Sequence, residues 1–198
     1  MTAKIKFYRI DNAERGFDAL TVRRGLFVGR FQPFHKGHTE AVKDILEKMD
    51  EIIIVIGSAQ YSHRLDNPFT TGERVTMIRD ALNEAKIPLS KVWIVPVEDL
   101  HVHMLWVAKI VGFSPEFSFV YTNEPLTRRL FTEAGFKAKP IPFHKRTLYS
   151  ATEIRKRMLA DEDWEALVPK SVAICIREMD GVNRLRDLAK TDEGQKGK

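Results

Sequence analysis

Two histidines in an H-x-G-H segment, His35 and His38, are the first candidates for chemistry in this sequence. The segment follows a short apolar run, and an apolar pattern of helical spacing comes after it. Gly37 lets a ligand approach the backbone closely, and the first turn of a helix presents free N–H groups. We therefore predict an anion site at this strand-to-helix turn, with His35 and His38 as imidazole donors and Arg30 as a permanent cation.

Other interpretations of these histidines stay open. A single loop histidine is more often structural than catalytic. Two histidines three apart could also bind a metal, but zinc needs three or four protein ligands and no third ligand is evident nearby. We therefore predict no metal held by protein ligands. The Walker P-loop and the G-x-G-x-x-G dinucleotide motif are both absent from the loop, so neither of these motifs explains it.

A second set of polar residues begins at Ser150. Ser150 and Glu153 have the S-x-x-E spacing of a capping box, which predicts a helix starting at Ala151. Thr152 and Arg155 lie near that N-terminus, where a cation is unfavourable unless an anion is bound. The alternative is an ordinary solvated basic helix face. We predict that this turn also meets a phosphate.

The elements that position these residues follow an alternating pattern. Apolar runs predict strands at 25–29, 52–56, 92–97, 117–121 and, more weakly, 137–143, and helical patterns cover 37–49, 72–85, 104–111 and 125–135. This alternation predicts an α/β fold, a Rossmann-like parallel sheet with helices on both faces. In such sheets ligands bind beyond the carboxyl ends of the strands, where the strand order reverses.

The two ends of the chain differ from this pattern. Residues 1–24 read as an N-terminal extension with an edge strand at 5–10, and the main domain covers residues 25–189. Its C-terminal segment is all-helical from about residue 150, and residues 190–198 are polar and predicted to be a disordered tail.

Composition narrows the class of protein. The 198 residues are 43% hydrophobic and 30% charged, as in an ordinary globular domain, and the net charge of +5 favours anionic ligands. The single cysteine, Cys175, excludes an internal disulfide and a multi-cysteine zinc site. No apolar run approaches the roughly 20 residues of a membrane-spanning helix. We expect a cytoplasmic protein with no membrane partner.

The two polar sets together resemble the nucleotidyltransferase superfamily, whose H-x-G-H and [I/L/Y]-S-x-T-x-[I/V]-R motifs bind ATP. Five separated segments are similar to the archaeal-type nicotinamide-nucleotide adenylyltransferase family. They are residues 24–38 (RGLFVGRFQPFHKGH), 56–60 (IGSAQ), 67–74 (NPFTTGER), Trp106 and 149–158 (YSATEIRKRM). The resemblance covers about residues 24–189.

The resemblance implies a reaction and a set of site residues. AMP would pass from ATP, carried with Mg²⁺, to nicotinamide mononucleotide, giving NAD and pyrophosphate in a homo-oligomer such as a hexamer. The implied catalytic residues are His35, His38 and Arg155. The implied ATP-binding residues are Val28, Gly29, Arg30, Phe31, Gln32, Ser150 and Thr152. The implied pyridine-nucleotide residues are Ser58, Trp106, Thr122 and Asn123.

Two of these assignments have competing interpretations. Without the family, Trp106 is more simply a core aromatic than a stacking platform for the nicotinamide ring. Asn123-Glu124 stands where the family usually has Gly-Asn, so the pyridine contacts of this loop depart from the pattern.

Three rival functions remain at this stage. The chain could be another nucleotidyltransferase, acting on phosphopantetheine, flavin mononucleotide or a polyol phosphate. It could bind RNA through Phe31, Phe34 and Phe69 near basic residues. It could be a nucleotide sensor without turnover. The basic residues belong to two helix N-termini suited to compact phosphates, so we expect no nucleic-acid partner.

Overall fold

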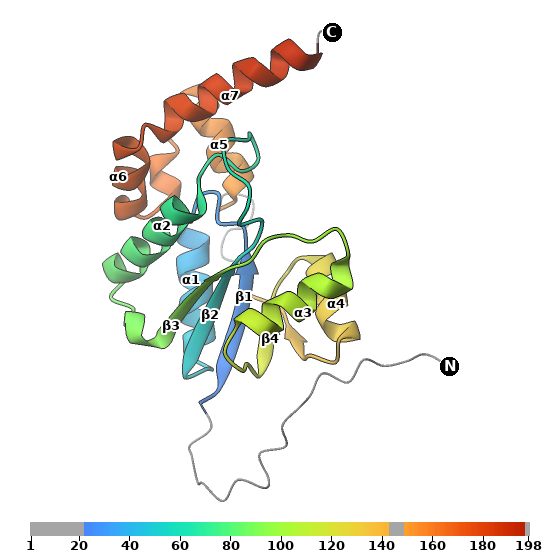
Figure 1. Ribbon diagram of the computed structural model, residues 1–198. Coiled ribbons are helices and arrows are strands. Elements are labelled where there is room, and N and C mark those ends of the chain that lie inside the picture. Colours follow the sequence, from blue (N-terminus) through green and yellow to red (C-terminus); the bar gives the residue numbers. More distant parts are fainter. Residues whose placement is uncertain (1–21, 143–148, 197–198) are drawn as a thin grey trace, which may run out of the picture.

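The computed structural model describes residues 22–142 and 149–196. Its centre is a five-stranded parallel sheet with the order β3-β2-β1-β4-β5 (Figure 1). The strands are β1 (Arg24–Gly29), β2 (Glu51–Ile56), β3 (Val92–Pro96), β4 (Phe119–Tyr121) and β5 (Ala138–Lys139). All of the described pairs are parallel, and β1 pairs with β2 along its whole length, from Arg24 opposite Glu51 to Gly29 opposite Ile56.

Seven helices accompany the sheet in the described part of the chain. They are α1 (Lys36–Leu46), α2 (Thr71–Glu84), α3 (His103–Phe113), α4 (Pro125–Glu133), α5 (Ala151–Ala160), α6 (Lys170–Glu178) and α7 (Gly181–Lys196), with short 3-10 turns at Leu89–Lys91 and Glu165–Leu167. None of the described helices is both long and apolar enough to cross a membrane.

The alternation of side chains along β2 divides the core between the two faces of the sheet. Ile52, Ile54 and Ile56 pack with residues of α1, α2, α5 and α6. Ile53 and Val55 point the other way and pack with residues of α3 and α4. All five side chains are fully buried, as expected for a strand covered on both faces. This confirms the predicted α/β fold with helices on both faces.

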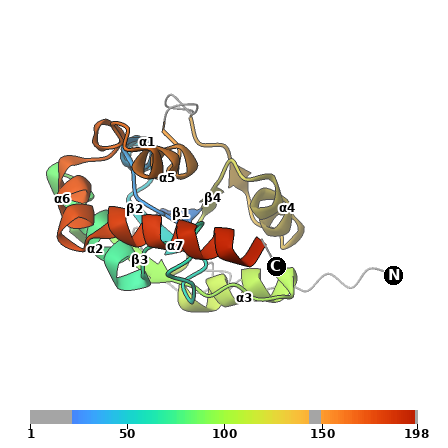
Figure 2. The ribbon, with the colours of Figure 1, turned by 90° about the horizontal axis from the view of Figure 1, so that it is seen from above.

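The C-terminal helices α5, α6 and α7 gather at the end of the sheet where β1 and β2 finish (Figure 1). Seen from above, α7 runs across that end of the molecule (Figure 2). α6 packs on α2 and α7 packs on α5, so these helices join segments that are distant in the sequence. The predicted C-terminal helical segment is confirmed.

Most predicted helix and strand boundaries differ from the structure by one to three residues, and three differences concern β4, β5 and the C-terminus. β4 begins at Phe119, and the ring of Phe117 stacks on that of Phe136 with the centroids 5.0 Å apart. β5 covers only Ala138–Lys139, and residue 143 of the predicted strand lies outside the described residues.

The third difference concerns the C-terminus, where α7 continues to Lys196 although a disordered tail was predicted from residue 190. A polar sequence can form a solvent-facing helix, and here Lys190 pairs with Asp187 at 3.0 Å. The extension before residue 22, with its predicted edge strand, lies outside the described residues.

Candidate functional site

A cavity of about 340 Å³ lies at the point where the strand order reverses. From β1 the chain proceeds to β2 and β3 on one side, and it returns to β4 and β5 on the other. The cavity is lined by the end of β1 and the loop after it, the first half of α1, the loop after β4, and the start of α5 with residues 141–142. This is the place where open α/β sheets bind ligands.

The histidines of the H-x-G-H segment cap the helix that they begin. His35 is the N-cap of α1, and its Nδ1 accepts a hydrogen bond from the His38 backbone N–H at 3.3 Å. In return, the His38 Nδ1 accepts from the His35 backbone N–H at 3.2 Å. The two rings stack with their centroids 3.5 Å apart. Because each Nδ1 is an acceptor, we assign the proton of each neutral ring to Nε2, which leaves one N–H donor on each imidazole.

Burial keeps both imidazoles uncharged. It lowers the pKa of His35 to about 4. Burial, and next the charge of His35, lower the pKa of His38 well below its usual value. The rings of Phe31 and Phe34 stand 4.9 Å and 5.2 Å from that of His38 and supply an apolar surround. The pair can therefore donate hydrogen bonds to an oxyanion at neutral pH without adding positive charge.

The positive charge in the cavity comes from two arginines. The Arg155 Nη1 donates to the Gln32 carbonyl at 2.7 Å, which holds the guanidinium between α5 and the loop after β1. Burial and then the nearby charge of Arg30 lower the pKa of Arg155. Arg30 pairs with Asp66 at 3.1 Å on the exposed rim. A bound anion would relieve the repulsion between the two guanidinium groups.

The start of α5 is only partly as predicted. The Ser150 hydroxyl accepts from the Glu153 N–H at 3.1 Å and so caps the helix. The carboxylate of Glu153 instead pairs with Arg157 at 2.9 Å, so the reciprocal half of the capping box is missing. Ser150 and Thr152 both line the cavity together with Arg155.

The cavity lining contains most of the predicted ATP-binding residues, namely Val28, Arg30, Phe31, Gln32, Ser150 and Thr152. It also contains the three predicted catalytic residues, His35, His38 and Arg155. Gly29 is not in the lining. A Cβ on it would come within 2.8 Å of the Phe31 ring, so its role is to admit that ring.

The side-chain amide of Gln32 already has hydrogen-bond partners within the protein. Its amide makes two hydrogen bonds of 2.9 Å with the backbone of Phe69, one to the carbonyl and one from the N–H. Gln32 is 1% exposed. Its contribution to the cavity is therefore its backbone carbonyl and the support that its side chain gives the loop.

The predicted pyridine residues are divided between two places. Thr122 and Asn123 line the cavity, although the Asn123 amide is already paired with the backbone of Ile141 at 2.8 Å and 3.1 Å. Ser58 and Trp106 do not line it. The Ser58 hydroxyl donates to Asp99 at 2.6 Å, and Trp106 packs edge-on against Phe131 with centroids 6.0 Å apart.

Sequence reasoning missed Arg74, which has no exposed surface. Its guanidinium donates to the carbonyls of Arg30 at 3.1 Å, Gly57 at 3.0 Å and Ser58 at 3.2 Å, and so ties the loop after β1 to the loop after β2. Burial lowers the pKa of Arg74 to about 10. A signal was present in the sequence, because Arg74 shares the apolar helical face of Met77 and Ile78.

Known proteins are similar to this chain in sequence. The model of the family described as cytidylyltransferase-like matches residues 26–157. A relative from Archaeoglobus fulgidus, named nicotinamide-nucleotide adenylyltransferase, is 55% identical over 85% of this chain and 99% of its own length.

Solved structures add a likeness of fold. A bifunctional NMN adenylyltransferase/ADP ribose pyrophosphatase from Francisella tularensis matches with a TM-score of 0.70 and 23% identity over 87% of this chain and 54% of the other. A second structure of that description, complexed with AMP and a manganese ion, has a TM-score of 0.67 and 25% identity over 87% of this chain and 53% of the other. The present chain thus spans about half the length of these solved proteins. On its match to the family model and its identity to the full-length archaeal relative, the chain belongs to the nicotinamide-nucleotide adenylyltransferase family.

Proposed function

We propose that the protein transfers AMP from ATP to nicotinamide mononucleotide, forming NAD and pyrophosphate. One observation carries the proposal: the N-terminus of α1, with two Nε2 donors, and Arg155 of α5 line the same cavity at the reversal of strand order. A compact polyphosphate complements such a site, because helix N-termini and guanidinium groups both stabilise anions. The family of the chain supports the choice of nucleotides.

In the proposed reaction, a phosphate oxygen of the mononucleotide attacks the α-phosphorus of ATP in line with the departing pyrophosphate. The new P–O bond forms as the bond between the α- and β-phosphates breaks. The attacking oxygen is already ionised at neutral pH, so no general base is needed. The protein's task is to align the two phosphates and to stabilise the charge that moves onto pyrophosphate.

Each cavity residue then has a defined task. His38 and Arg155 stabilise the transition state, one by a neutral donor and one by charge, and His35 and Arg30 hold phosphate oxygens. The start of α5, with Ser150 and Thr152, closes on the triphosphate. Each preorganised contact of this kind contributes roughly 3–4 kcal/mol.

Mg²⁺ suits this arrangement as an ion carried by ATP. Among the described residues, no three His, Cys, Asp or Glu side chains are grouped so that they could hold a metal ion. The cavity carboxylate of Glu124 accepts hydrogen bonds from Leu126 and Thr127 at the start of α4. Mg²⁺ commonly takes substrate phosphates and waters as ligands, and its charge would neutralise the phosphate oxygens.

The contacts of the pyridine nucleotide are part of the proposal. Thr122 and Asn123 line the cavity. Ser58 and Trp106 lie outside the cavity lining, where they would contact the pyridine nucleotide beyond it. The buried Trp106 Nε1–H, which has no partner within the described part of the chain, is a donor that a ligand could use.

The assembly is also a proposal. A homo-oligomer such as a hexamer, in the cytoplasm, follows from the resemblance. Met104, Leu105 and Phe113 of α3 are 63%, 57% and 60% exposed and offer apolar surface for it. Sedimentation would give the number of subunits.

The test is to mix the protein with ATP, Mg²⁺ and nicotinamide mononucleotide and to measure NAD and pyrophosphate. Parallel reactions with flavin mononucleotide and phosphopantetheine test the rival transferases. We expect NAD alone, with Arg155→Ala strongly impaired. Arg157→Ala is the matched control, because Arg157 lies on the same helix and pairs with Glu153 outside the cavity lining. Formation of FAD or dephospho-CoA instead, or no product from any acceptor, would contradict the proposal.

A further inference from the structure

The placement of Arg155 depends on a segment that does not belong to its own helix. Among the residues that the structure describes, its guanidinium has one hydrogen-bond partner, the Gln32 carbonyl at 2.7 Å. Gln32 follows β1 in a loop, where no sheet partner fixes the backbone. The position of that carbonyl therefore depends on what holds Gln32.

Gln32 is held by the backbone of Phe69. Its side-chain amide and the Phe69 peptide groups exchange two hydrogen bonds of 2.9 Å, in a region where Gln32 is 1% and Phe69 0% exposed. Two buried bonds between planar groups leave little freedom for the loop. The location of the Pro68–Thr70 segment therefore sets the location of Gln32.

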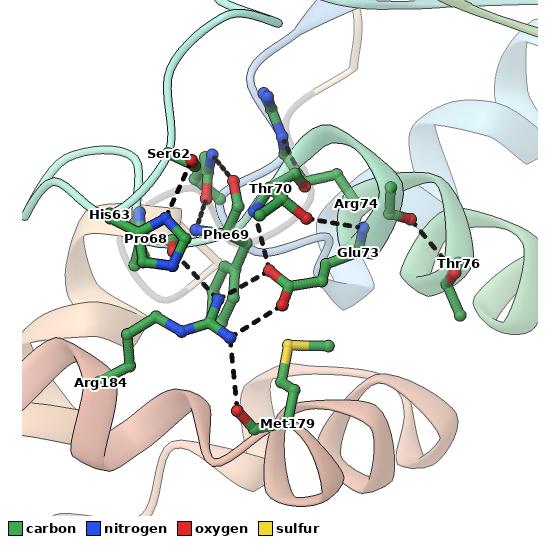
Figure 3. Close-up of polar contacts among 12 residues, drawn as sticks. Ser62, His63, Pro68, Phe69, Thr70, Glu73, Arg74, Thr76, Met179 and Arg184 are labelled. Carbon is green, nitrogen blue, oxygen red and sulfur yellow. Dashed lines mark hydrogen bonds and ion pairs between the residues drawn. The ribbon is translucent and has the colours of Figure 1, made fainter.

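The Pro68–Thr70 segment is held from outside by α7, as Figure 3 shows. Arg184 donates to the Pro68 carbonyl at 3.3 Å and forms two bonds with the Glu73 carboxylate at 2.7 Å and 2.8 Å. Glu73 in turn accepts from the Thr70 N–H at 2.8 Å. A two-bond guanidinium–carboxylate pair fixes direction as well as distance.

A second contact from α7 supports the same segment. Gly181, the first residue of the helix, lies so close to the Phe69 ring that a Cβ would come within 2.8 Å of it. Arg184 itself does not line the cavity. Its effect on Arg155 would pass through Phe69 and Gln32, whose carbonyl accepts from the Arg155 guanidinium.

We propose that Arg184 is a positioning residue for Arg155, acting through the Pro68–Thr70 segment and Gln32. The inference rests on the proposed function, in which Arg155 stabilises the departing pyrophosphate. The C-terminal helix α7 then has a role in the reaction although none of its described side chains, up to residue 191, lines the cavity. The conservative variant Arg184→Lys keeps the charge but loses the two-bond geometry, so it should restore part of the activity.

The test is a double-mutant cycle that measures kcat for NAD formation in wild type, Arg184→Ala, Arg155→Ala and the double variant. We expect Arg184→Ala to lower kcat between about tenfold and a hundredfold, as small misplacements of catalytic groups do. In the Arg155→Ala background the same change should alter kcat by less than about twofold, because its target is gone. Equal losses in both backgrounds would overturn the proposal, since they would show an action independent of Arg155.

Two controls separate this inference from a loss of folding and from the proposed function. Arg186→Ala, on the same helix, removes a surface pair with Asp161 and should leave kcat unchanged. If Arg184→Ala does not fold, the cycle is run with Arg184→Lys. If wild type makes no NAD, the proposed function fails. The cycle is then read from the Kd for ATP in the same four proteins, where additive losses would overturn the positioning role.

Discussion

The stacked histidine pair predicts that the protein loses stability as the pH falls from 7 to 5. His35 is buried and caps α1, and its pKa in the folded protein is about 4, against 6.5 for an ordinary histidine. Between these two pKa values, the imidazole of His35 is therefore protonated in the unfolded chain and neutral in the folded protein. Above about pH 6.5 the titration of His35 therefore has little effect on the free energy of unfolding. As the pH falls from 6.5 toward 4, it lowers the free energy of unfolding progressively.

The magnitude follows from the two pKa values. At pH 5 the imidazole is almost fully protonated in the unfolded chain and almost fully neutral in the fold. The linkage relation gives a loss of about 2 kcal/mol in the free energy of unfolding between pH 7 and pH 5 from His35 alone. His38, whose pKa is also lowered, acts in the same direction.

The assay is urea unfolding of wild type and His35→Asn at both pH values. Asparagine is a good N-cap residue without a titratable group. The stability difference between the two proteins should therefore shift by about 2 kcal/mol in favour of the variant on acidification. His63→Asn, which removes an exposed imidazole outside the pair, is the matched control substitution. An identical loss of stability in wild type and His35→Asn would refute the assignment of a buried neutral imidazole.

Three further predictions concern activity and structure. His38→Ala should lower kcat by about a hundred- to a thousandfold with a smaller change in KM for ATP, since a transition-state donor is lost; an equal change in KM would point to simple binding. Arg74→Lys should destabilise the fold by about 3 kcal/mol in thermal or urea unfolding, because one ammonium cannot reach the carbonyls of both loops, and an unchanged midpoint would contradict this. EDTA should abolish NAD formation, and added Mg²⁺ or Mn²⁺ should restore it. NAD formation without a metal ion would contradict the proposal that the metal ion binds together with ATP.

The place of the site could be predicted because it depends on local signals and on topology. Apolar runs alternate with helical patterns, and the H-x-G-H segment follows one of those runs. The rule for parallel sheets then puts His35 at the reversal of strand order, where the cavity is found. Arg155 lies on a helix after the sheet, and only the resemblance to the family joined it to this place.

What could not be predicted depends on contacts between distant segments. The amides of Gln32 and Asn123 look like ligand-binding groups in the sequence, but each is hydrogen-bonded to the backbone of another segment, at Phe69 and Ile141. One local contact also differs from the prediction, because Glu153 pairs with Arg157 on the same helix and half of the expected capping box is missing. Asp99, which accepts from the Ser58 hydroxyl, lies 41 residues further along the chain, so no local sequence pattern indicates this contact.

The histidines show the same limit. Their spacing indicated donors, but their protonation follows from burial and from reciprocal bonds to the backbone, which only the fold provides. The H-x-G-H motif therefore supplies neutral donors, and the charge comes from Arg30 and Arg155.

The central claim is that a triphosphate lies between the N-terminus of α1 and the guanidinium of Arg155. A crystal structure of the protein with Mg²⁺ and a non-hydrolysable ATP analogue tests it most directly. We expect phosphate oxygens about 3 Å from the Nε2 atoms of His35 and His38, with Arg155 on the β- or γ-phosphate. A triphosphate bound away from the first turn of α1, or an Arg155 that does not touch it, would show that the phosphates bind elsewhere.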